Sequence, residues 1–272
     1  MKKVLGLTLA TALTASVLGS VSAMAATVNS YTSNGQIGFI ASTDPTDPKD
    51  PLNPTDPVDP IDPTDPTKPV TPGTNGPLSL DFASSLDFGV QKITTADETY
   101  QAASQQYAHA DGSKSFGPDY AQITDNRGTF QGWTLSVAQQ GDFKTTSGAV
   151  LNGAQVTLGN DNHVTASVLD GSVSNVDTAT LNPDGSSVNV MSGAAASAGS
   201  TNGTSGTHLL DFGTAASLKN DQVSWKADNT TVARPSTDSD VTLAVPGTTA
   251  KMADTYTTTF LWTLGDTPTA VK

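Results

Sequence analysis

The histidines and the carboxylates are the residues of this chain that could carry out catalysis or hold a metal. His109, His163 and His208 lie in no spacing typical of a metal site, and none stands beside a nucleophile motif. The sequence has no G-x-S-x-G motif, no H-E-x-x-H motif and no glycine-rich phosphate loop. Carboxylates near Asp161, such as Asp184, fit turns better than a glycosidase pair. We therefore expect a chain that is not an enzyme, with no catalytic residues, no metal site and no cofactor.

Tryptophan is the more informative residue type, because the chain has only three and two of them begin the same tripeptide. The two tripeptides are Trp133-Thr134-Leu135 and Trp262-Thr263-Leu264. On a strand, the Trp and Leu of each tripeptide point to one face and the Thr to the other. Because Trp has so much surface to bury, we expect both rings mainly to fill a core. The alternative is that one ring is partly exposed and stacks on a glycan or on a partner strand. These six residues are our candidate binding or structural site.

Strands must position these residues, because residues 73–272 consist of short alternating apolar runs separated by turn signals. No long helical period stands out. The pattern predicts an all-β fold, an antiparallel β-sandwich-like single domain with a long Pro-rich insertion or spacer near its N-terminus. Roughly 200 residues can bury one adequate core. The stretch 191–207 is almost entirely Ser, Gly, Ala, Thr and Asn, which predicts a long surface loop.

Two shorter segments precede this domain. In residues 27–43, Ile37, Phe39 and Ala41 would share one face of a strand, and a lone strand buries too little to fold by itself. We therefore expect this strand to pack on the main domain. In residues 44–72, a proline stands at every third position from Pro45 to Pro72, often after Asp. That period matches polyproline II, which predicts a solvated spacer of roughly 85 to 90 Å. A calcium-binding strip is disfavoured, because carboxylates along a rod do not converge.

Residues 1–26 combine Lys2 and Lys3, an apolar run and an Ala-rich cleavage site, which predicts a secretory signal peptide. The formal net charge is −13, so the chain should bind neither nucleic acid nor an anionic membrane surface. Without cysteine it can take no disulfide and no lipid anchor. We also find no sortase signal and no C-terminal transmembrane helix. A secreted chain of this kind is expected to hold the cell surface non-covalently, with no direct membrane insertion after signal cleavage.

The residues around both tripeptides resemble the WxL-domain surface proteins of low-GC Gram-positive bacteria. The resemblance rests on Thr124-Asp125-Asn126-Arg127-Gly128-Thr129-Phe130-Gln131-Gly132 before Trp133, on Tyr256 to Pro268 around Trp262, and on the lead-in Leu78-Ser79-Leu80-Asp81-Phe82. It covers nearly the whole chain after the signal peptide. Phe260 and Leu261 depart from it mildly, since Leu-Thr is more usual there.

The resemblance implies a secreted protein of the cell wall that binds peptidoglycan non-covalently through residues 73–272. It also implies a surface complex with co-encoded proteins, including a membrane-anchored WxL-interacting protein. The alternative is an adhesin or assembly subunit whose domain binds another surface or host protein, possibly by addition of a strand at a sheet edge.

Overall fold

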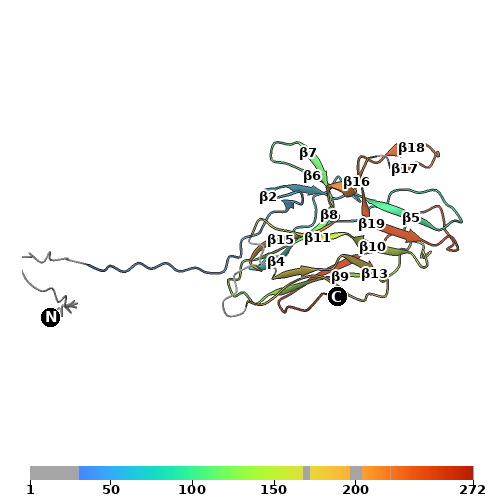
Figure 1. Ribbon diagram of the computed structural model, residues 1–272. Helices are drawn as coiled ribbons and strands as arrows, with labels where there is room; N and C mark the ends of the chain where they lie inside the picture. Colours follow the sequence, from blue (N-terminus) through green and yellow to red (C-terminus); the bar gives the residue numbers. More distant parts are fainter. Residues whose placement is uncertain (1–30, 168–171, 197–203, 221, 272) are drawn as a thin grey trace, which may run out of the picture. The chain divides into compact units, whose positions relative to one another are not determined.

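The computed structural model describes residues 31–167, 172–196, 204–220 and 222–271, so the predicted signal peptide lies outside the described residues. The chain divides into two compact units, Met1–Phe39 and Ile40–Lys272. The second unit contains every strand described here, and all strand pairs are antiparallel. The predicted all-β, antiparallel sandwich-like fold is confirmed (Figure 1). Within the described residues, no helix is long and apolar enough to cross a membrane.

Three larger sheets build the domain. The motif sheet has the order β12 (Val173–Asn175), β14 (Val188–Gly193), β9 (Trp133–Gln139), β20 (Phe260–Gly265). The facing sheet has the order β11 (Asp161–Val164), β15 (Gly206–Phe212), β8 (Asp119–Asp125), β4 (Leu78–Ala83). The third sheet has the order β13 (Thr178–Leu181), β10 (Gln155–Gly159), β19 (Thr237–Val245), β16 (Leu218–Lys219), and β5 (Glu98–Ala103) also pairs with β19.

Smaller elements complete the second unit. They are the sheet β3 (Asp59–Ile61), β6 (Gln105–Ala108), β7 (Lys114–Gly117), the hairpins β1 (Lys49–Asp50)–β2 (Asn53–Pro57) and β17 (Val223–Trp225)–β18 (Thr231–Ala233), and the 3-10 turn η1 (Ala215–Ser217). In Figure 1, β2, β6 and β7 lie above the facing sheet, and β9 lies below it.

One apolar core joins the three larger sheets, because alternate residues of each strand point into it. Ile123 of β8, Leu135 of β9, Val156 of β10 and Val241 of β19 are all fully buried in it. A second, smaller cluster of Phe82, Tyr120 and Leu209 is separate from this core. Neighbours on β8 and on β15 thus belong to different clusters, so both faces of the facing sheet are covered.

The predicted polyproline spacer is wrong, because the structure folds residues 44–72 onto the domain. The N–H of Lys49 donates to the side chain of Gln122 at 2.7 Å, and the Tyr107 hydroxyl donates to Asp50 at 2.7 Å. Val58 is buried, and β3 pairs with β6. Polyproline II lies within the β region of backbone angles, so the same prolines fit short edge strands. Val58 and Ile61 interrupt the Asp-Pro-Thr repeat and supply the apolar side chains that a solvated rod would lack.

The strand predicted within residues 27–43 is also not found. Residues 31–43 form no strand, and the side chains of Ile37 and Phe39 are 78% and 89% exposed. The predicted surface loop 191–207 is wrong at both ends, because Met191 is fully buried in β14 and β15 begins at Gly206.

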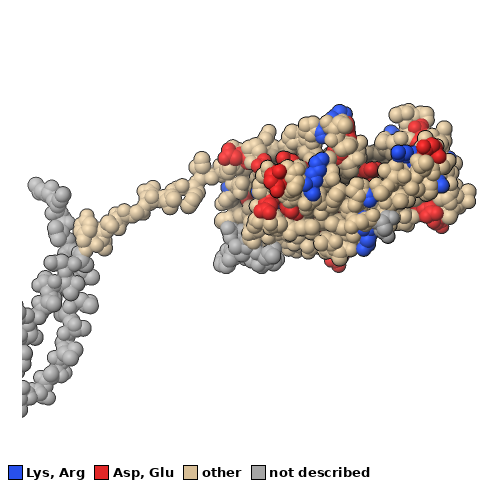
Figure 2. Space-filling model, turned by 90° about the horizontal axis from the view of Figure 1, so that it is seen from above, with Lys and Arg blue, Asp and Glu red and all other residues tan. Residues whose placement is uncertain are grey.

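Charged side chains on the face shown in Figure 2 are scattered and of both signs, with wide uncharged areas between them. No continuous basic area appears on that face, in keeping with the acidic net charge of the chain.

Candidate binding groove at the tryptophan motifs

The two Trp-Thr-Leu motifs lie side by side on neighbouring strands of the motif sheet. In the antiparallel register of β9 and β20, Leu135 stands opposite Leu264, and Val137 stands opposite Trp262. As predicted, the Trp and Leu of each motif face the core. The two motifs therefore form one structural unit around the Leu135–Leu264 pair.

Trp133 is a core residue. Its side chain has no exposed surface, and its indole N–H donates to the backbone oxygen of Thr204 at 2.9 Å. The ring lies 5.3 Å from the ring of buried His208 on the facing sheet. His208 in turn stacks on His163, with Nδ1 and Nε2 3.0 Å apart. Burial lowers the pKa of both histidines, that of His163 to about 4, so both are neutral at pH 7.

The residues before Trp133 fix the start of β9. The Arg127 guanidinium makes two charge-assisted hydrogen bonds to the Asp125 carboxylate, at 2.9 and 2.8 Å, and a third to the backbone oxygen of Gly132 at 2.6 Å. Gly132 has φ of 77°, which favours glycine, and it lies against the backbone of Gly193 on β14. These contacts explain why the motif extends upstream of Trp133.

Sequence reasoning missed Gly193, Thr204 and His208, all of which contact Trp133. A Cβ atom at Gly193 would lie 2.7 Å from the Trp133 ring, so the ring fills the place of a side chain there. The three residues carry no signal in their local sequence, because they reach Trp133 through strand pairing and packing with distant segments.

The two motif threonines lie on the other face of the sheet. Thr134 donates to the backbone oxygen of Thr267 at 2.9 Å and accepts from the N–H of Thr269 at 2.7 Å, which ties the residues after β20 to β9. Thr263 is exposed. Both threonines therefore lie away from the core, as the sequence predicted.

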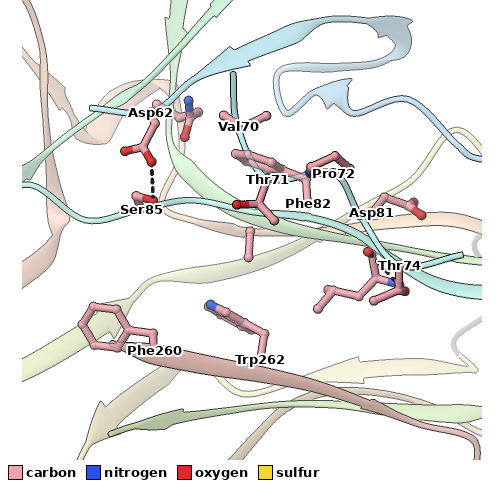
Figure 3. Close-up of a pocket in the computed structure, with 14 residues that line it drawn as sticks. Asp62, Val70, Thr71, Pro72, Thr74, Asp81, Phe82, Ser85, Phe260 and Trp262 are labelled. Atoms are coloured by element: carbon pink, nitrogen blue, oxygen red, sulfur yellow. Dashed lines mark hydrogen bonds between the residues drawn. The ribbon is translucent and has the colours of Figure 1, made fainter. Parts of the chain in front are cut away.

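Trp262 differs from Trp133, because its ring is only partly buried. It stacks on Phe212 of the facing sheet with the ring centroids 5.8 Å apart. No hydrogen-bond partner for its indole nitrogen occurs among the described residues. Its ring forms part of the wall of a groove of about 290 Å³ (Figure 3).

This groove lies between β20 and the segment that leads into and through β4, and we call it the motif groove. Phe260 and Trp262 form one wall, as Figure 3 shows, and Val70, Pro72 and Phe82 lie across from them. Its remaining lining residues are Asp62, Thr71, Gly73, Thr74, Leu80, Asp81, Ala83, Ser85 and Gln105. Aromatic and apolar walls with a few polar groups are typical of binding sites for small ligands or extended chains.

Two carboxyl groups line the motif groove, and no basic residue does. Asp81 accepts hydrogen bonds from Ser79 and Thr124, each at 2.6 Å, and burial raises its pKa above the usual aspartate value. Asp62 accepts a hydrogen bond from Ser85 at 3.3 Å. Groups of three or more His, Cys, Asp or Glu residues that could hold a metal do not occur within the described ranges. The groove therefore offers carboxylate and hydroxyl acceptors beside an open aromatic ring.

The fold and this site define an all-β domain with a paired tryptophan motif. The family model described as "WxL domain surface cell wall-binding" matches residues 26–268. The chain therefore belongs to this family of surface proteins of the cell wall, which confirms the resemblance seen in the sequence and places the protein at the cell surface. No curated protein and no solved structure matched the chain.

Proposed function

We propose that this domain attaches the protein non-covalently to peptidoglycan, and that the motif groove is the contact with the wall. Membership of a cell wall-binding family supports the attachment. The observation that carries the proposal is the difference between the two rings: Trp133 is sealed in the core, whereas Trp262 is partly exposed in a groove that is also lined by Asp62 and Asp81. An exposed indole can stack on the apolar face of a sugar, and carboxylates can accept hydrogen bonds from its hydroxyl groups.

In this proposal the domain binds and does not catalyse. Its place in a surface complex with co-encoded proteins, including a membrane-anchored WxL-interacting protein, rests on the family resemblance. The family description supports the cell wall as partner and is silent on those proteins.

Binding to cell-wall sacculi stripped of protein tests the proposal. Replacing Trp262 with Ala should weaken binding about fivefold or more, since loss of a single stacked aromatic contact is worth about 1 kcal/mol or more. The matched control is Trp225→Ala in the separate β17–β18 hairpin, where the ring lies under Lys92 and should leave wall binding unchanged. Circular dichroism melting of both variants separates loss of contact from loss of folding. If a folded Trp262→Ala variant binds sacculi with wild-type affinity, the motif groove is not the contact with the wall.

A further inference from the structure

Strand β20 has one unpaired edge. The backbone oxygen of Thr259 accepts from the N–H of Gln140, so odd-numbered residues of this run face β9. The backbone N–H and C=O groups of Phe260, Trp262 and Leu264 therefore point away from β9, and none has a backbone partner among the described residues. An edge of this kind is a template for another strand.

The opposite side of the motif groove is already closed. Strand β4 is the last strand of the facing sheet, and its Leu80 is bonded through both backbone groups to Thr74. Gly73 lies so close to β4 that a Cβ atom there would clash with the backbone oxygen of Asp81. A strand entering the groove can therefore pair with β20 and not with β4.

The same chain carries a segment suited to that edge. Residues 31–43 form no strand but run as an extended chain in Figure 1. They contain no charged side chain and include Tyr31, Ile37, Phe39 and Ile40, all more than three-quarters exposed. On a strand, Ile37 and Phe39 would share one face and Ile40 would lie on the other. The segment is longer than the six residues of β20.

We propose that residues 31–43 of a second copy of this chain add to the free edge of β20, with Ile37 and Phe39 inserted into the motif groove. The inserted strand satisfies the outward backbone groups of Phe260, Trp262 and Leu264, and its apolar face covers the Trp262 ring. An uncharged segment avoids repulsion from Asp62 and Asp81, whereas the acidic remainder of the chain would be repelled.

Such a contact is head to tail, because the donor segment and the acceptor edge are different surfaces of the chain. Each copy that accepts a strand can donate its own segment to the next, which builds a linear row. The inference rests on the proposed function in one respect: the inserted strand and the wall ligand occupy the same groove and exclude each other. Only the copy with an empty groove at the end of a row then binds the wall.

Self-association of the chain from residue 27 onward, followed by light scattering against protein concentration, tests the proposal. Ile37→Asp should weaken association at least about tenfold, because burial of one such side chain is worth about 1.5 kcal/mol or more. Ile40→Asp is the matched control, since it adds the same charge to the same segment on the face away from the groove. A synthetic peptide of residues 31–43 should compete with both self-association and sacculus binding.

The absence of cysteine makes a direct test of the pairing possible. Gly38→Cys and Thr263→Cys in one chain place two thiols on the outer face of the proposed strand pair, and oxidation should give a ladder of linked copies. A linked single chain would instead show that the segment pairs with its own β20, and it would overturn the proposal. The proposal would also be overturned if the chain stayed monomeric at every concentration, or if Ile37→Asp and Ile40→Asp weakened self-association equally. Unchanged sacculus binding in those cases would leave the proposed wall attachment standing.

Discussion

At the scale of single residues, the Trp133 ring is tightly packed on all sides, so substitutions at Trp133 or at its neighbours should destabilise the domain. The ring takes the place of a side chain at Gly193, donates its N–H to Thr204 and lies beside His208. Truncating a buried Trp to Ala typically costs about 3–5 kcal/mol. Trp133 is therefore a residue that holds the motif sheet to the facing sheet.

We expect Gly193→Ala to destabilise the domain by about 1–3 kcal/mol, because the new Cβ would lie 2.7 Å from the Trp133 ring. Trp133→Phe provides a smaller ring, so the double variant should lose less stability than the sum of the two single changes. Denaturant unfolding of the wild type, the two single variants and the double variant measures the coupling energy between Gly193 and Trp133. If the double variant loses as much stability as the two single variants together, Gly193→Ala and the Trp133 ring do not compete for the same space.

The tripeptide pattern was enough to predict which side chains face the core, because strand periodicity fixes that locally. It could not predict that Trp133 is sealed while Trp262 is partly open. That difference arises because β9 has a partner strand on each side, whereas β20 is the last strand of its sheet. The alternative of one partly exposed ring describes the position of Trp262, and its role as a ligand contact remains a prediction.

At the scale of elements, the Pro-rich segment is the largest departure from expectation. A proline at every third position is compatible with both polyproline II and short edge strands. Only contacts with the rest of the fold decide between the two. Here the partners are Tyr107 on β6 and Gln122 on β8, each of which bonds to the segment. The run 191–207 shows the opposite error, since small polar residues predicted a loop where Met191 and Ser192 lie in a sheet.

We expect a chain shortened to begin at Gly73 to melt several degrees below a chain that begins at Ser42. The shorter chain loses buried Val58 and Asp50, and it exposes Tyr107 and Gln122. Each lost kcal/mol lowers the melting temperature of a domain of this size by roughly 2–4 °C. Thermal melting followed by circular dichroism gives the comparison. Equal melting temperatures would restore the idea of an independent spacer.

At the scale of the whole molecule, buried carboxyl groups outnumber the buried cations near them. Burial raises the pKa of Asp161 to about 8 and that of Asp238 to about 7, and it raises those of Asp119 and Asp211 well above the usual value. These groups come from several strands, so their protonation is a property of the folded domain. The sequence predicted the acidic balance of the chain and could not predict which of its aspartates the sheets would bury.

The folded state therefore holds more protons than the unfolded chain between about pH 4 and pH 8, and stability should rise as the pH falls from 8 to 6.5. Below pH 6.5 the lowered pKa values of His163 and His208 oppose this rise, because the unfolded histidines bind protons first. Melting temperatures at pH 8, 6.5 and 5, at one ionic strength, measure the balance between the contributions of the aspartates and the histidines. Asp161→Asn should flatten the change between pH 8 and 6.5, and a melting temperature that increases with pH would contradict the assignment.

The pairing of β9 with β20 also bears on when the chain can fold. Ser136 and Thr263 are 127 residues apart and yet touch between β9 and the edge strand β20 of the motif sheet. Contacts between such distant residues slow folding, because a long loop must close before they form. A chain that reaches the cell surface from its N-terminus onward would have its motif sheet without β20 until residues 260–265 emerged. The second tryptophan motif would then act as a timing element, holding back completion of the motif sheet until the long segment between β9 and β20 has also reached the outside.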